Sequence, residues 1–312
     1  MKRWLTLLAA LGCVWLTLAT PTAQAASKTL YVGTCKEPSP YATIQSAVDA
    51  VTGAGFTIAV CPGTYNEHVE VANKQRLSIR NAAEKSQGMP LIDAGGSDGI
   101  VIRDSTNVEI RGLQITNTNM AIVAAQAPKT EIRDMVITNA KQYGIFFNGS
   151  HKSEAQKNSI SGSGFVGISA VDTPEVSIKQ NSVASFNYNI YVFSSANAKV
   201  VSNHVTNASQ TGILLANLTH ATVKHNTASF SSYGITLGGT NSNTISENIV
   251  RNNSTAGLLV ESSAAGNTIR KNQLQNNGTD AIDRSTGSQT VGTANTWSHN
   301  TCATSTPAGL CT

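Results

Sequence analysis

The sequence predicts an all-β solenoid, a rod in which short strands stack coil upon coil. The first observation is a pattern that returns every 22 to 24 residues between 99 and 281, for example GIVIRDS at Gly99, GIFFNGS at Gly144 and GITLGGT at Gly234. Such a period is typical of a solenoid, because each repeat buries its apolar face only against its neighbours. The second is composition. Charged residues make up only 13% of the chain, which suits a surface of polar β-turns better than one of helices.

Residues 1–25 have the features of a signal peptide. A short basic start precedes the apolar run 4–20, and Ala23-Gln24-Ala25 offers small residues at both ends of a cleavage motif. The apolar run is too short and too poorly flanked for a spanning helix. We therefore expect a secreted or periplasmic protein that has no membrane span and begins near Ala26.

The net charge is weak. It is +4 for the whole chain, and half of that excess lies in the predicted signal peptide. This balance gives no case for a nucleic acid or a membrane surface as partner.

Four cysteines remain in the mature chain: Cys35, Cys61, Cys302 and Cys311. An even count in an exported protein indicates two disulfides, with three possible pairings. The spacing favours Cys35–Cys61 and Cys302–Cys311, one bridge at each end of the repeats.

The segments around the repeats are predicted to close the ends of the rod. Residues 26–56 form an N-terminal cap, because Thr43–Val51 carries apolar residues at helical spacing and predicts an amphipathic helix over the first coil. Residues 57–301 form the solenoid. Residues 302–312, which include a loop bounded by two cysteines, form the C-terminal cap.

Each repeat carries the pattern of three short strands. In the first strand apolar residues alternate by two, as Ile100 and Ile102 do, and so point inward. A second short strand follows, and in most coils an Asn then leads into a third apolar stretch. Three strands per coil predict a three-sided prism whose coils rise by about 4.8 Å each.

The segment before the repeats carries a family resemblance. ATIQSAVDA at 42–50, PGTYNEHVEV at 62–71 and PLIDAGG at 90–96 resemble the first segment of right-handed parallel β-helix proteins of the pectin-lyase-like superfamily. The repeat-rich bacterial branch of that superfamily includes the periplasmic NosD-type proteins and the mannuronan epimerases. The resemblance implies a right-handed parallel β-helix over nearly the whole mature chain. It implies less about activity, because a fold does not carry a function.

One column of equivalent positions consists of asparagines at the turn after the second strand: Asn158, Asn181, Asn203, Asn226, Asn248 and Asn272. Earlier coils place Leu113 and Met135 there, which predicts that the column points inward. Because a buried amide both donates and accepts, stacked asparagines satisfy one another. We predict a structural ladder here and not a sugar-binding row.

A second column points outward at the end of the second strand. It is cationic in five of eight coils: Arg111, Arg133, Lys179, Lys224 and Arg270. A row of fixed cations suits an extended polyanionic glycan. A solvated surface that keeps the rod soluble is the more frequent explanation, and both stay open.

The outer face of the first strand is the predicted substrate groove, because the resembled superfamily commonly binds substrate there. Phe146, Tyr191 and Phe193 are a candidate aromatic platform for sugar rings, and Asn148 and Asp172 are candidate polar contacts beside it. An outward-facing apolar strip on a protein surface usually contacts a ligand, a loop or another chain. The face is therefore either an open groove or one covered by a loop or a partner chain.

Candidate catalytic residues are few. Glu261 and Asp283 are expected one rung and two strand positions apart, roughly 8 Å, which falls in the range of inverting glycosidases, although a salt bridge closing the last coil is the more frequent explanation. A lyase mechanism needs a neutralising cation and a base, for which Arg103, His151 and Tyr191 are the candidates.

Neither the Asp-Pro-His stretch of the epimerases nor the first-strand aspartate cluster of calcium-dependent pectate lyases occurs in the sequence. No Met/His cluster and no Cys/His spacing indicates copper or zinc. We predict no metal site and no cofactor, with calcium (Ca2+) left open.

Together these features predict an exported, monomeric right-handed parallel β-helix with an N-terminal capping helix, which binds an extracellular or periplasmic polysaccharide. Whether it also processes that glycan, as a lyase or an epimerase does, is left open. The alternative is a noncatalytic carbohydrate-binding or structural surface protein.

Overall fold

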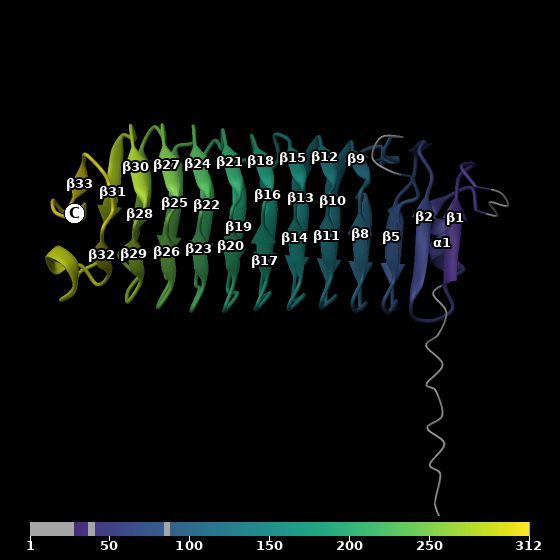
Figure 1. The fold of residues 1–312 in the computed structure, drawn as a ribbon, viewed down its shortest axis with the longest axis horizontal. Helices are drawn as coiled ribbons and strands as arrows, with labels where there is room; N and C mark the ends of the chain where they lie inside the picture. Colours follow the sequence, from purple (N-terminus) through teal and green to yellow (C-terminus); the bar gives the residue numbers. More distant parts are fainter. Residues whose placement is uncertain (1–27, 37–40, 84–87, 312) are drawn as a thin grey trace, which may run out of the picture.

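A computed structural model describes residues 28–36, 41–83 and 88–311 of the chain. The predicted signal peptide lies outside the described residues. The chain winds into a three-sided rod whose coils stand side by side from one end to the other (Figure 1). Neighbouring strands pair in parallel within each of three sheets, so the predicted all-β solenoid is confirmed.

Sheet A lies along the bottom of Figure 1 and consists of the predicted second strands. Its 12 strands are β1 (Lys28–Val32), β2 (Phe56–Val60), β5 (Ser78–Asn81), β8 (Glu109–Arg111), β11 (Glu131–Arg133), β14 (Glu154–Gln156), β17 (Ser177–Lys179), β20 (Lys199–Val201), β23 (Thr222–Lys224), β26 (Thr244–Ser246), β29 (Thr268–Arg270) and β32 (Thr296–Ser298).

Sheet B lies along the top of Figure 1 and consists of the predicted third strands. Its 10 strands are β3 (Thr64–Tyr65), β6 (Leu91–Asp93), β9 (Gln114–Thr116), β12 (Val136–Thr138), β15 (Ser159–Ser161), β18 (Ser182–Ala184), β21 (His204–Thr206), β24 (Thr227–Ser229), β27 (Ile249–Arg251) and β30 (Gln273–Gln275).

Sheet C runs between them in the same view and consists of the predicted first strands. Its 11 strands are β4 (Val69–Ala72), β7 (Ile100–Arg103), β10 (Thr118–Ala125), β13 (Ala140–Asn148), β16 (Val166–Val171), β19 (Tyr188–Phe193), β22 (Thr211–Ala216), β25 (Tyr233–Gly238), β28 (Ala256–Val260), β31 (Thr279–Asp283) and β33 (Ser305–Thr306).

The recurring glycine of the repeat is explained by the close approach of successive coils. A Cβ atom on Gly144 would lie 2.5 Å from the carbonyl oxygen of Gly167, and one on Gly234 would lie 2.6 Å from that of Gly257. A side chain at these positions would push the coils apart. The glycine therefore sets the spacing that buries the neighbouring Ile145 completely.

The predicted asparagine ladder is confirmed. Asn226 is fully buried. Its Nδ2 donates to Asn248 Oδ1 (3.0 Å) and to the Val200 carbonyl (2.8 Å), while its Oδ1 accepts from the backbone N–H and Nδ2 of Asn203 (2.9 and 3.0 Å). The same pattern repeats along what we call the asparagine ladder: Asn158, Asn181, Asn203, Asn226, Asn248, Asn272 and Asn300. Each side-chain amide thus donates a hydrogen bond to the amide oxygen of the next asparagine, so both its donor and its acceptor are paired.

Both ends of the rod differ from its middle. At the N-terminal end, helix α1 (Ile44–Asp49) begins after Thr43, whose hydroxyl accepts from the backbone N–H of Ser46, and it contacts β1, β2 and β4. At the other end a 3₁₀ turn, η2 (Thr290–Gly292), precedes β32. No helix in the described part of the chain is long and apolar enough to cross a bilayer.

The favoured disulfide pairing is confirmed at both ends. Cys35 is bonded to Cys61 and Cys302 to Cys311, each with 5.4 Å between the Cα atoms.

Candidate functional site

Sheet C carries six aromatic rings in one unbroken row. The ring contacts run Phe146–Tyr143 (centroids 4.8 Å apart), Tyr143–Phe165 (6.0 Å), Phe165–Tyr188 (5.5 Å), Tyr188–Tyr191 (6.1 Å) and Tyr191–Phe193 (6.1 Å). We call these six residues the aromatic ridge. They come from β13, from β19 and from the residue before β16, which are neighbouring coils.

The strand register brings these rings together. Phe146, Ser169 and Tyr191 are partners on three successive strands, and Tyr143 is aligned with Tyr188 through Val166. Ring pairs at these separations each contribute about 0.5–1.5 kcal/mol beyond their buried area. The rings therefore hold one another on a solvent-facing sheet, where Phe165 keeps 43% of its surface exposed.

The sequence pattern predicted three of the six ridge residues. The candidate platform residues Phe146, Tyr191 and Phe193 lie in it, whereas Tyr143, Phe165 and Tyr188 were missed. Tyr143 and Tyr188 directly precede the first residue of their repeats. Their position shows that the strands of sheet C begin earlier than the seven-residue pattern does.

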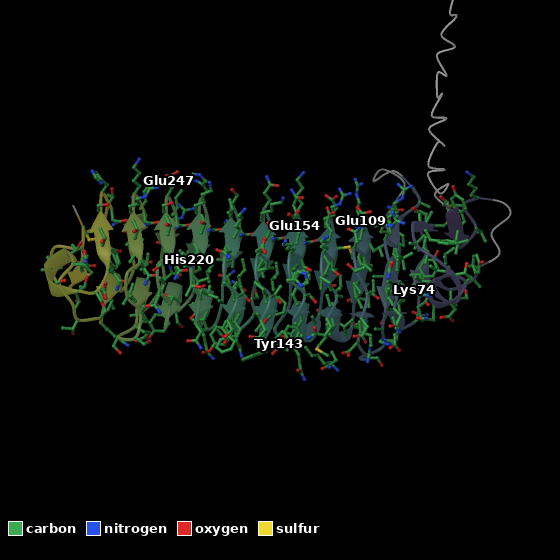
Figure 2. All side chains as sticks on the ribbon, turned by 90° about the horizontal axis from the view of Figure 1, so that it is seen from below. Lys74, Glu109, Tyr143, Glu154, His220 and Glu247 are labelled. Carbon is green, nitrogen blue, oxygen red and sulfur yellow. A yellow bond between two sulfur atoms is a disulfide. The ribbon has the colours of Figure 1, made fainter. Side chains whose placement is uncertain are left out.

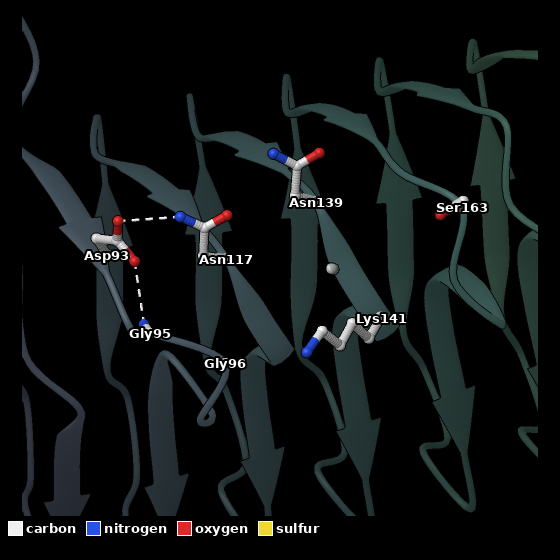
Figure 3. Close-up of a pocket in the computed structure, with 8 residues that line it drawn as sticks. Asp93, Gly95, Gly96, Asn117, Asn139, Lys141 and Ser163 are labelled. Carbon is white, nitrogen blue, oxygen red and sulfur yellow. Dashed lines mark hydrogen bonds between the residues drawn. The ribbon is translucent and has the colours of Figure 1, made fainter.

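A hollow of about 510 Å³ adjoins the ridge, at the edge where sheet B turns into sheet C. It is lined by Asp93, Gly95, Gly96, Asn117, Asn139, Ala140, Lys141 and Ser163 (Figure 3). Lys141 lies two residues before Tyr143, and Ser163 two before Phe165. We call this region the Lys141 hollow.

Some polar groups of the hollow are hydrogen-bonded within the protein, and one charged group is not. The Asp93 carboxylate accepts from the backbone N–H of Gly95 and from Asn117 Nδ2, both at 3.0 Å, as the dashed lines in Figure 3 show. The Lys141 side chain is exposed, and no carboxylate of the described residues forms an ion pair with it. The hollow therefore presents one free ammonium group beside fixed amides.

The cationic column lies on sheet A and is not a bare row of cations. Arg111 pairs with Asp134 (3.3 Å), Arg133 with both Glu109 and Glu131, and Lys179 with Glu154 (2.8 Å). In the described residues Lys224 and Arg270 have no carboxylate partner.

Glu109, Glu131 and Glu154 are partners on successive strands of sheet A and form a column of their own. This column lies two residues before the cationic column on each strand. The signal was present in the sequence as Glu-Ile-Arg at 109–111 and 131–133, since residues two apart share a sheet face. In Figure 2, Glu109 and Glu154 lie in the upper half of the rod, whereas Tyr143 lies near its lower edge. One ligand strand on the ridge therefore does not also cover this charged column.

The expected pairing of Glu261 with Asp283 is wrong. Asp283 is the register partner of Val260, one position from Glu261, and so faces the interior. Its carboxylate accepts from Trp297 Nε1 (2.8 Å) and from Ser285, while Glu261 forms an ion pair with Arg284 (3.1 Å) outside. The salt bridge expected at this end does form, but its acid is Glu261.

The three lyase candidates do not assemble either. Arg103 pairs with Glu70 (3.0 Å), and His151 is exposed in the turn between β13 and β14. Burial, with the nearby hydroxyls of Tyr188 and Tyr143, raises the pKa of Tyr191. A general base must first give up its own proton, so this shift disfavours Tyr191 as the base.

The two candidate polar contacts lie at the C-terminal ends of β13 and β16, where Asn148 is in register with Phe193 through Val171. Asn148 ends β13 with a half-buried side chain, and Asp172 is exposed in the turn that follows β16. Asp172 has a φ of 48°, a left-handed conformation that Asp tolerates better than most residues. The geometry of the turn accounts for this Asp.

Two families match the sequence. One, described as "Right handed beta helix region", matches residues 78–228, and the other, described as "Periplasmic copper-binding protein (NosD)", matches residues 163–306. No curated protein matches the sequence.

The solved structures that resemble the rod include proteins named for carbohydrates. The A-module of a mannuronan C-5 epimerase from Azotobacter vinelandii has a TM-score of 0.58 at 14% identity, over 84% of this chain and 92% of that one. Pectate lyase Pel9A has a TM-score of 0.57 at 12% identity, over 90% and 78%. A structure described as XylC with xylose has a TM-score of 0.65 at 11% identity, over 80% and 69%. At such identities these likenesses show the fold alone.

The NosD description implies copper, which the residues present do not fit. Across the ranges that the structure describes, no three His, Cys, Asp or Glu side chains come together as a metal site requires. The four described cysteines are bound in disulfides.

Proposed function

Because the chain is a right-handed parallel β-helix protein of the pectin-lyase-like type, we propose that it binds a polysaccharide outside the cytoplasm, along sheet C. The aromatic ridge is the observation that carries this proposal. The two disulfides agree with an oxidising compartment such as the periplasm or the cell exterior.

The chemistry of the ridge fits sugar rings. A pyranose has apolar C–H faces and a polar rim, and C–H groups carry a small positive charge that the face of an aromatic ring attracts. The Lys141 hollow beside the ridge adds fixed amides and one ammonium group for hydroxyls or a carboxylate. The names of the epimerase and the pectate lyase among the similar structures support the same class of ligand.

Binding without turnover is the form of this function that the geometry favours. The candidate acids and bases lie apart: Asp283 faces the interior, and Arg103 and Glu261 are engaged in ion pairs. Processing by lyase or epimerase chemistry requires groups within hydrogen-bond reach of one sugar, and these residues do not provide them.

A glycan array followed by product analysis tests the proposal. We expect saturable binding to at least one polysaccharide and no rise in the absorbance of unsaturated uronate products. Binding with such a rise would establish a lyase instead. Failure to bind any glycan would overturn the proposal.

We propose two further features of the molecule that agree with this role. Helix α1 buries Ile44, Ala47 and Val48 against the first strands and covers the open end of the rod, which protects the protein from end-to-end association. The protein is therefore proposed to act as a monomer, which sedimentation would test.

A further inference from the structure

We propose that the ridge selects an extended glycan with two-fold symmetry, laid parallel to the rod axis, and that Tyr233 continues the contact row beyond the ridge. This inference rests on the proposed polysaccharide binding and specifies the shape of the chain that is bound. It concerns the linkage geometry of the glycan and holds for a neutral or an acidic polymer.

The register places three tyrosines on alternate rungs of sheet C. Tyr143, Val166, Tyr188, Thr211 and Tyr233 are direct partners on five successive strands. The three tyrosines are half-buried and reach the surface, whereas Val166 and Thr211 between them are buried. Tyrosines therefore recur every second rung, about 9.6 Å apart by the rung spacing of the sheet.

This spacing matches one type of glycan chain. In a chain of diequatorially 1,4-linked pyranoses, each sugar advances by nearly one rung, and successive sugars are turned over relative to each other. Every second sugar then presents the same face to the same side. Tyrosines on every second rung would meet equivalent faces along such a chain. A chain coiled by mixed axial–equatorial linkages, as in an α-1,4-glucan, would lose this match after one repeat.

Neighbouring side chains fix the orientation of the tyrosines. Phe165 lies at 88° to the ring of Tyr143 and at 82° to that of Tyr188, on the rung between them. The hydroxyl of Tyr188 donates to the side chain of Gln210. Two of the three rings are therefore held in place before a ligand arrives, which reduces the entropy lost on binding.

Phe230 provides an independent reason to extend the row to Tyr233. It lies three residues earlier, is 57% exposed, and has a φ of 56°. Asn207 and Asn252 occupy the same turn position in the adjacent coils with the same backbone conformation. A bulky residue in this conformation is unfavourable, and so is its exposure. Such a position indicates a contact with a ligand.

Length-matched oligosaccharides test the inference on the unmodified protein. Two pairs differ in linkage at constant charge: β-1,4-linked against α-1,4-linked glucuronan hexamers, and cellohexaose against maltohexaose. We expect the diequatorial member of at least one pair to bind about tenfold more tightly, which corresponds to one alternate-rung contact. Equal affinities, or a preference for the coiled members, would overturn the inference and leave polysaccharide binding intact. If neither these hexamers nor any arrayed glycan bound, the proposed function itself would fail.

Substitution of the distant tyrosine supplies a second test. Tyr143 and Tyr233 are four rung steps apart, about 19 Å, so a hexamer reaches both and a trimer does not. We expect Tyr233→Ala to weaken hexamer binding about tenfold and to leave trimer binding unchanged, while Tyr233→Phe keeps the affinity for both. His204→Ala, an exposed site on sheet B, serves as the control. Unchanged hexamer binding in folded Tyr233→Ala would contradict the extended row.

Discussion

The asparagine ladder and the aromatic ridge are built in the same way, one side chain above another on successive coils, yet they have opposite properties. Inside the rod, each amide of the ladder is fully paired with the next amide and with a backbone carbonyl. On sheet C, the rings touch one another but keep one side open to solvent. Stacking that satisfies every group stabilises the fold, whereas stacking that leaves faces open creates a surface for a ligand.

The ladder is the place where this comparison predicts the largest loss of stability. Asn226→Ala removes four hydrogen bonds and leaves two donors of Asn203 buried without an acceptor. At about 1–3 kcal/mol for each unsatisfied group, we expect the free energy of unfolding to fall by about 3–5 kcal/mol. Urea titration followed by circular dichroism measures this fall.

Asn241→Ala is the matched control, because the side chain of Asn241 is exposed between β25 and β26, and we expect a change within about 0.5 kcal/mol there. Equal losses for the two variants would mean that pairing within the ladder is not what stabilises the rod. Glycan binding of folded Asn226→Ala should remain unchanged, since the ladder lies inside the prism.

The ridge predicts a different pattern from the ladder, a clear effect on glycan binding and a smaller loss of stability. Phe165 touches Tyr143 and Tyr188 and is 43% exposed. We expect Phe165→Ala to weaken glycan binding about tenfold, or about 1.4 kcal/mol, and to lower the free energy of unfolding by about 1–3 kcal/mol through the loss of its two ring contacts. Calorimetric titration and urea unfolding give the two numbers.

Ile249→Ala provides the comparison for Phe165. Ile249 is also apolar and exposed, at 39%, but it lies on sheet B. It should change neither quantity appreciably. If Ile249→Ala weakened binding as much as Phe165→Ala did, the ligand would not be confined to the ridge.

The sequence predicted the interior of the rod better than its surface for a physical reason. A one-residue error in register turns a side chain to the opposite face, so apolar residues and the ladder asparagines are confined to single positions that the period reveals. The surface has no such constraint. Asp283 was assigned to the wrong face because β31 pairs one position away from the expected register.

The missed surface residues illustrate the same limit. The alternation of β13 identified Phe146 as outward-facing but did not show that Tyr143 would stack on it, because ring contacts depend on side-chain orientation. Likewise, the cationic column was considered without the glutamates that neutralise it. Patterns along the sequence reveal single columns, whereas the chemistry of a surface arises between columns.

The charged part of sheet A should add a small stability term that depends on pH. Burial alone would raise the pKa of Glu109, but hydrogen bonds from Ser78 and Arg133, with the charges of Arg133 and Arg111, hold it below its ordinary value. A carboxyl group with a lowered pKa stabilises the fold above its unfolded pKa of about 4.3 and loses this effect as the pH falls through the folded value. This charge contribution to the free energy of unfolding should stay under about 1 kcal/mol, because the side chains of Glu109 and Arg133 both remain partly exposed.

Glu109→Gln isolates this contribution. Relative to the unmodified protein, the variant should be less stable at pH 7 and equally stable near pH 2, as measured by urea unfolding at each pH. A constant difference across the pH range would assign the effect to packing and not to charge.

Ser169 sharpens the comparison between ladder and ridge most directly, although its effect should be the smallest. It lies in the outward column between Phe146 and Tyr191, is 1% exposed, and its hydroxyl has no hydrogen-bond partner. A buried hydroxyl without a partner is unfavourable, so Ser169→Ala should leave the free energy of unfolding unchanged or raise it by up to about 1 kcal/mol. The same type of change, a buried polar residue replaced by Ala, thus has opposite signs in the two columns. Urea unfolding measures the change. A loss of more than about 1 kcal/mol would show that the Ser169 hydroxyl has a hydrogen-bond partner in solution. The ridge column and the ladder would then not differ in whether their buried polar groups are paired.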